Sequence, residues 1–211
     1  MTALIDVEYV TDWLPGTQDG EDETVLEQLI EAESQAITLR TGRKFVKDAD
    51  ESVRIFDVPV TNTLGLYEPE IPGGVRDNPV EVLIDDLSAA PTLVELRDQN
   101  GVLVKTLVVN TDYVLLPRNR ETWQPITAMR FRNTVSVYAG YELHVTGTWG
   151  FPSVPEDIKQ ACRARVAAKF LPSIARVATA FAGEMDQGFD LSRALAASFQ
   201  AVDSYRYVRV G

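Results

Sequence analysis

The sequence predicts an α+β protein in which a helical bundle core, formed by N- and C-terminal helices, carries a large inserted β-region. Apolar residues recur with the 3.6-residue helical period before residue 52 and again after residue 155, while between them the period is two. No long helical pattern interrupts that middle part, so its sheet is expected to be mainly antiparallel. Helices at both ends imply that the two ends pack together.

The first predicted domain, residues 1–51, supplies the N-terminal helices of the core. A short amphipathic element comes first and ends at Pro15-Gly16. Asp22 or Thr24 is expected to cap a longer helix, and Thr41-Gly42 is expected to end it. The apolar face of this helix is predicted to comprise Val25, Leu26, Leu29, Ile30, Ala36 and Ile37.

The second predicted domain, residues 52–150, is the inserted β-region. Its alternating, β-branched segments predict seven short strands, at 53–58, 80–87, 92–98, 102–109, 112–116, 126–132 and 142–149. Asn100-Gly101 indicates a two-residue hairpin of type I′, in which both central residues have positive φ. Two loops, 68–78 and 117–125, interrupt the strands.

The chain returns to helix through the run HVTGTWGFPSVPEDIKQAC, residues 144–162. Pro155 suits the first helical position, and the aromatic rings of Trp149 and Phe151 need a packed surface. We therefore expect Trp149, Phe151 and Pro155 to form the packing of the junction between the β-region and the helical core.

The third predicted domain, residues 151–203, supplies the C-terminal helices of the core. Its first helix has one apolar face, made of Ile158, Ala161, Cys162, Val166 and Phe170. Pro172 is expected to end or kink this helix, a second helix reaches Gly183, and Asp190 caps a third. The third helix aligns Leu191, Leu195, Phe199 and Val202.

Composition narrows the classes of function. The net charge is -11, concentrated in the N-terminal part, and there is no basic stripe with which to grip nucleic acid. The negative charge either serves ordinary solubility or forms an acidic surface along which DNA can pass without binding. One cysteine permits neither an internal disulfide nor a cysteine-based zinc site. No leader and no membrane-spanning apolar run is expected, so no membrane partner is predicted.

No constellation for catalysis, cofactor binding or metal binding is evident, so the chain is expected not to be an enzyme and to need no cofactor. His144 lies on a predicted strand, where a structural role is expected, and Cys162 is predicted to be a buried, inert thiol. Asp85-Asp86 is expected at a solvated edge, and the acidic loop 19–23 lacks the spacing of a calcium loop. Trp13, Trp123 and Trp149 are expected in packing rather than in stacking platforms.

The last predicted segment, residues 204–211, is a C-terminal tail in which aromatic and apolar residues alternate with arginines. Such a segment either pairs with this chain's own sheet or adds as a strand or peptide anchor to another subunit. The candidate anchor residues are Tyr205, Arg206, Tyr207, Val208, Arg209 and Val210.

Together these features resemble the head-tail adaptor (connector, or head-completion) proteins of long-tailed bacteriophages and of gene transfer agents. The resemblance rests on the helix ending in Thr-Gly-Arg, VLEQLIEAESQAITLRTGRKF at 25–45, and on the run VTGTWGFPSVPEDIKQAC at 145–162. It covers both helical ends and the order of the elements, and it is weak across the β-region.

The resemblance implies a structural virion protein that assembles in the host cytoplasm and resides at the head-tail interface. It implies a homo-oligomeric ring, a dodecamer, beneath the portal protein, which completes the DNA-filled head and offers a docking surface to a stopper or other neck or tail protein. DNA would pass through the channel without specific binding, and residues 205–210 would anchor the ring to the portal.

Two alternatives belong to other classes. Another neck component, such as a stopper or a tail terminator, would be mostly β-structured and would lack the flanking helices. A ligand- or carbohydrate-binding β-module would use Trp123 and its loop.

Overall fold

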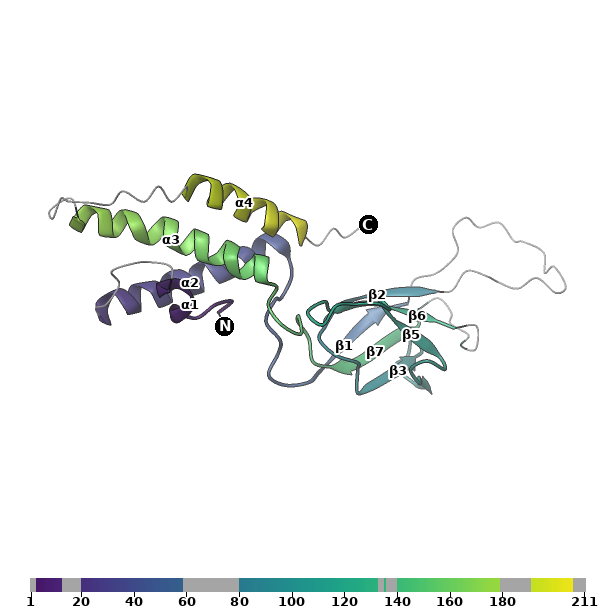
Figure 1. The fold of residues 1–211 in the computed structure, drawn as a ribbon. Helices are drawn as coiled ribbons and strands as arrows, with labels where there is room; N and C mark the ends of the chain where they lie inside the picture. The colour runs from purple at the N-terminus through teal and green to yellow at the C-terminus, as the bar shows by residue number, and fades with distance from the viewer. Residues whose placement is uncertain are drawn as a thin grey trace. The chain divides into compact units, whose positions relative to one another are not determined.

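The computed structural model describes residues 3–12, 20–58, 80–132, 135, 140–178 and 191–206. The chain divides into two compact units, drawn in Figure 1. The helical unit combines Met1–Val46 with Val154–Gly211, and the β-unit is Lys47–Ser153. The predicted α+β class, with both ends of the chain in the helical part, is confirmed.

The helical unit contains α1 (Val7–Thr11), α2 (Gly20–Thr41), α3 (Glu156–Ala178) and α4 (Leu191–Ser204). Helices α2, α3 and α4 contact one another, while the short α1 contacts α2 and α3. Figure 1 shows α4 running alongside α3. None of the helices described is both long enough and apolar enough to cross a membrane.

The start of helix α2 differs from the prediction, whereas its end agrees with it. It begins at Gly20, so the prediction that Asp22 or Thr24 caps it is wrong, because both residues lie inside the helix. Its end is as predicted. Gly42 has a φ of 68°, and its amide donates to the Thr38 carbonyl at 2.9 Å. Glycine takes this left-handed conformation without the steric cost that a side chain would add.

The buried face of α2 differs in part from the predicted one. Leu26, Ile30 and Ile37 are fully buried, as expected, but Val25 is 43% exposed. Glu33 is buried in the same face instead. The periodicity predicted the centre of the buried face correctly. Whether Val25 and Glu33 belong to that face depends on the residues that pack against α2.

Helix α3 begins at Glu156, and the carbonyl of Pro155 accepts the first helical hydrogen bond, from the Lys159 amide at 3.1 Å. All five residues of its predicted apolar face are buried: Ile158, Ala161, Cys162, Val166 and Phe170. The helix continues past Pro172 to Ala178, so proline does not end it. Helix α3 packs along α4, and tertiary packing commonly overrides the local preference of a residue that disfavours helix. Gly183 and Asp190 lie outside the described residues.

The β-unit consists of two antiparallel sheets. Its strands are β1 (Ser52–Asp57), β2 (Glu81–Leu87), β3 (Leu93–Arg97), β4 (Leu103–Thr106), β5 (Tyr113–Leu116), β6 (Ile126–Phe131) and β7 (Glu142–Gly147). The four-stranded sheet has the order β1-β7-β3-β4 and the three-stranded sheet the order β2-β6-β5. Every predicted strand is present, and every pairing between these described strands is antiparallel, so this part of the prediction is confirmed.

One apolar core of described residues includes side chains from both sheets. Leu143 and Val145 of β7 and Met129 of β6 are fully buried in it, together with Trp149. Because alternate residues of a strand point to opposite faces, each sheet contributes one face to this core and leaves the other outside. The predicted loop 68–78 lies outside the described residues.

The β3–β4 hairpin forms at Asn100-Gly101 as predicted, but the turn type is different. Gly101 has a φ of 76°, whereas Asn100 does not have positive φ, so the turn is not type I′. The Asp98 carboxylate accepts hydrogen bonds from the amides of Asn100 and Val102, both at 2.9 Å. These bonds stabilise a three-residue loop in which only glycine needs the left-handed conformation.

The predicted solvated edge at Asp85-Asp86 is wrong for one of the two residues. Asp85 is partly exposed and accepts from Arg54 at 2.7 Å, but Asp86 is only 7% exposed. The pairing of β2 with β6 shifts register between Leu83 and Leu87, and this irregularity breaks the simple alternation of faces.

We predict that Gly147→Ala destabilises the β-unit. The added methyl group would lie 2.7 Å from Cδ1 of Leu87, a fully buried side chain with little room to move. Overpacking of this kind costs about 1–3 kcal/mol, measurable by denaturant unfolding. The same change in a Leu87→Val background should cost less, because the clashing atom is gone. Equal costs in both backgrounds would contradict the explanation.

Candidate functional site

The C-terminal tail leaves the helical unit at a well-packed tyrosine. The Tyr205 ring makes an edge contact with Phe45, with centroids 5.5 Å apart, and its hydroxyl donates to Asp157 at 3.2 Å. Burial, helped by the charge of Asp157, raises the pKa of Tyr205 to about 12. Arg206, the next residue, is exposed. The tail therefore begins from a fixed point on the unit.

The other four candidate anchor residues, Tyr207, Val208, Arg209 and Val210, lie outside the described residues. Of the six residues that the sequence singled out, the structure thus places Tyr205 in a packed position and Arg206 at the surface.

Helix α4, which carries the tail, is attached to α2 through charged groups. Arg40 binds Asp203 with two hydrogen bonds, Nε to Oδ1 at 2.8 Å and Nη2 to Oδ2 at 2.9 Å. The Phe199 ring lies beneath two guanidinium groups, those of Arg40 and Arg165, each 5.2 Å from its centroid. Val202, on the same helix, is fully buried. Such cation–π contacts hold an otherwise half-exposed ring in place.

A buried ion cluster connects α2 to α3. Glu33 is 1% exposed and accepts hydrogen bonds from Arg165, at 2.5 Å, and from Lys169. Burial alone would raise the pKa of Glu33, but the bonds from Lys169 and Arg165 outweigh it and lower that pKa. One atom, Nη1 of Arg165, is buried without a hydrogen-bond partner within the part of the chain that is described.

This cluster was not predicted from the sequence, although one feature of the sequence pointed to it. Glu33 follows Leu26 and Ile30 at helical spacing, so it stands on the apolar face of α2. A carboxylate on such a face needs a buried partner, and α3 carries two cations one turn apart, Arg165 and Lys169. The sequence did not show that these helices would face each other there.

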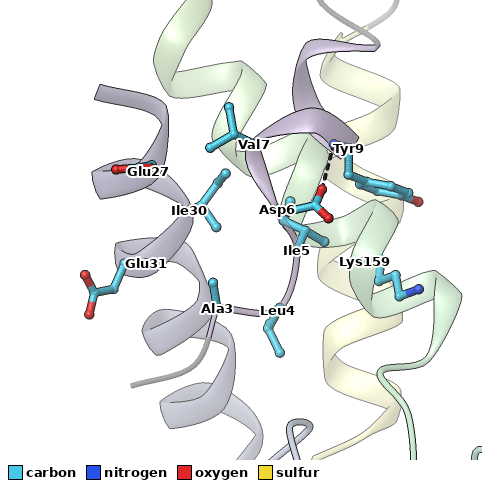
Figure 2. Close-up of a pocket in the computed structure, with 10 residues that line it drawn as sticks. All are labelled: Ala3, Leu4, Ile5, Asp6, Val7, Tyr9, Glu27, Ile30, Glu31 and Lys159. Atoms are coloured by element: carbon cyan, nitrogen blue, oxygen red, sulfur yellow. Dashed lines mark hydrogen bonds between the residues drawn. The ribbon is translucent and has the colours of Figure 1, made fainter. Parts of the chain in front are cut away.

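A shallow depression opens where the N-terminal segment crosses α2 and α3 (Figure 2). It has a volume of about 620 Å³. Its lining consists of Ala3, Leu4, Ile5, Asp6, Val7, Tyr9, Glu27, Ile30, Glu31 and Lys159. The Tyr9 ring lies 4.8 Å from the Arg163 guanidinium, and its hydroxyl donates to Glu156. These contacts hold the N-terminal segment on α3.

The predicted junction residues are all buried. Trp149 lies in the core of the β-unit, where its Nε1 donates to the Ser52 carbonyl at 2.9 Å and the Arg54 guanidinium lies 4.5 Å from its ring. Phe151 is 1% exposed, and Pro155 is buried at the start of α3. A role for the three residues as packing between the two parts stays a prediction.

His144, Cys162 and Trp123, which were considered above as candidate functional residues, are each at least half-buried. His144 is half-buried on β7 and lies 3.0 Å from Glu142. Cys162 is fully buried, and burial raises the pKa of its thiol to about 11, so the thiol is protonated at neutral pH. Trp123 is half-buried. Over the described ranges, no three side chains of the metal-binding types come together.

Comparisons with known proteins identify a shared fold. No protein-family model matches the chain, and no curated protein matches it. A chain from the neck of an empty gene transfer agent (GTA) particle with C6 symmetry is 16% identical, with a TM-score of 0.49, over 97% of this chain and 89% of that chain. A chain from the virion of a native GTA particle is 17% identical, with a TM-score of 0.52, over 99% and 92%. The resemblance to GTA proteins is confirmed at the level of the fold.

We predict that Glu33→Gln destabilises the helical unit by about 3–5 kcal/mol, because it leaves the buried guanidinium of Arg165 without its carboxylate. Denaturant unfolding followed by helix content measures the loss. Glu31→Gln, an exposed residue of the same helix, is the matched control and should change little. Equal effects of the two changes would show that the cluster does not stabilise the fold.

The same cluster predicts a pH dependence. Because the pKa of Glu33 is lower in the folded than in the unfolded chain, its contribution to stability is present above the ordinary carboxyl pKa. That contribution is lost as the pH falls through the lowered, folded-state pKa. Wild-type protein should lose stability in this acidic range, and Glu33→Gln should lack that part of the loss.

Proposed function

We propose that the chain is a structural virion protein, a head-tail adaptor that forms a ring beneath the portal, completes the DNA-filled head and provides a docking surface for the neck and tail. The proposal rests on one observation, the shared fold. The fold, including both helical ends and the inserted β-unit, is shared along almost the whole chain with a protein of a native GTA virion.

The helical unit favours an adaptor over a stopper or a tail terminator. Those neck components are expected to be mostly β-structured, whereas here segments from both ends of the chain build one helical unit. The alternative of a carbohydrate-binding module would use Trp123, and this side chain is half-buried.

The tail is the proposed portal anchor. Tyr205 fixes its first residue on the helical unit through Phe45 and Asp157, so the arginines and aromatic residues that follow start from a defined position. A short segment of this kind binds a partner through main-chain hydrogen bonds, while its tyrosine and arginine side chains set the register.

An acidic face of α2 fits the passage of DNA. Glu23, Glu27 and Glu31 are exposed and spaced four residues apart, so they lie along one side of the helix. In a ring that turned this side toward the channel, the carboxylates would repel phosphate groups and let DNA slide.

We predict that the purified chain binds DNA-filled heads that have a portal but lack this protein, and that a chain ending at Arg206 does not. The shortened chain keeps Tyr205 with Phe45 and Asp157, so its helical unit should stay folded. Co-sedimentation with heads measures binding, and Tyr205→Phe, which keeps the ring, is the control. Undiminished binding of the shortened chain would exclude the tail as anchor. Failure of the full chain to bind would count against the adaptor role itself.

We predict that heads completed with a Glu23→Lys, Glu27→Lys, Glu31→Lys variant release their DNA more slowly than wild-type heads. Added lysines would bind phosphates that carboxylates repel. Glu121→Lys, a charge reversal at an exposed position of the β-unit, is the control and should leave release unchanged. The readout is the rate of DNA release, and an equal rate for the triple variant would remove α2 from the channel wall.

A further inference from the structure

The depression beside the N-terminal segment combines an apolar lining with an acidic rim (Figure 2). Ala3 and Val7 in its lining are at least partly exposed, and Ile30 is buried beneath them. Glu27 and Glu31 are exposed, stand one turn apart on α2, and take part in no ion pair within the described residues. A surface of this kind fits a segment that carries both apolar side chains and positive charge.

The charge of the depression is negative. Asp6 adds a third carboxylate to the lining, and it accepts a hydrogen bond from the Tyr9 amide at 2.8 Å. Lys159 is the one cation among the lining residues, and its Nζ already lies 3.6 Å from the Glu156 carboxylate. The carboxylates of the rim are therefore left for arginines from elsewhere, which bind carboxylates with two parallel hydrogen bonds.

The C-terminal tail has the matching composition. Residues 206–211 read RYVRVG, with two arginines, one tyrosine, two valines and no acidic side chain. This run is positively charged in a chain whose net charge is -11. Its arginines can neutralise the rim, while the tyrosine and the valines can cover the apolar lining.

The tail also starts beside the depression. The Tyr205 hydroxyl donates to Asp157 at 3.2 Å. Tyr9, which lines the depression, donates its hydroxyl to Glu156. Glu156 and Asp157 are neighbours in the first turn of α3. Residues 206–211 span roughly 20 Å when extended, so they are long enough to pass from Tyr205 over the start of α3 to the depression.

We propose that residues 206–211 dock into the depression of the same chain while the subunit is free, and that docking withholds the tail from other partners. The same chain is the source of the segment because a tail tethered this close is present at a high effective concentration. Release of the tail to the portal, which also uncovers Glu27 and Glu31, rests on the proposed function. The docking itself is independent of that function.

Paramagnetic broadening of amide signals tests the docking. A nitroxide attached to Gly211→Cys of the full chain should remove most of the intensity of the Ala3, Ile5 and Val7 amide signals, and reduction of the nitroxide should restore it. Cys162 is fully buried and should not be labelled. When isotope-labelled chains without nitroxide are mixed with nitroxide-bearing chains without isotope, the signals should stay. Their loss in the mixture would show that the tail binds another copy and would overturn docking within one chain.

Two charge reversals on α2 separate this docking from a general attraction to an acidic helix. Glu31→Lys, in the lining, should restore the amide intensities because it places a like charge beside the arginines. Glu23→Lys, which is exposed on the same side of α2 but outside the lining, should leave the broadening as it is. Both positions are exposed, so neither change should unfold the helix. Equal intensities in the two variants would overturn the proposal.

The same two variants distinguish the docking from the adaptor role. Because a docked tail lowers the fraction of binding-competent chains, Glu31→Lys should bind portal-bearing heads at a lower protein concentration than wild type, whereas Glu23→Lys should match wild type. An unchanged affinity of Glu31→Lys would show that docking does not withhold the tail. Broadening without binding to heads by any variant refutes only the adaptor role, and binding to heads without broadening refutes only the docking.

Discussion

The burial of Glu33 between α2 and α3 is the interaction on which the helical unit depends. A carboxylate at 1% exposure is tolerable only because Arg165 and Lys169 bind it. The same Arg165 guanidinium covers Phe199 and so helps to position α4. The two ends of the chain are therefore joined through one charged centre, and the helix that carries the C-terminal tail takes its position from that centre.

The β-unit depends on a different kind of contact. Trp149 follows β7 and is buried in the apolar core, while its indole N–H donates to the first residue of β1. One side chain thus fixes the strand that leaves the helical unit and the strand that leads back to it. This pairing of the entry and exit strands, continued along β1 and β7, lets a large insertion leave and rejoin the chain.

The proposed function assigns separate surfaces to separate tasks. The tail residues from Tyr205 onward would bind the portal, and the exposed carboxylates of Glu23, Glu27 and Glu31 on α2 would face the DNA. The first surface alternates arginines with aromatic and apolar residues, whereas the second is acidic. Because their charges are opposite, part of the second surface would also hold the tail while the subunit is free.

The sequence by itself determined the element types, the antiparallel strands, the buried face of α3 and the helix end at Gly42, because each follows from local periodicity or from the conformational freedom of one residue. It did not determine the burial of Glu33 and Asp86, the turn type at Asn100 or the continuation of α3 past Pro172. Each of these depends on partners distant in sequence, or on competing hydrogen bonds such as those of Asp98. Only the tertiary structure brings those partners together, and it alone decided which polar groups are buried.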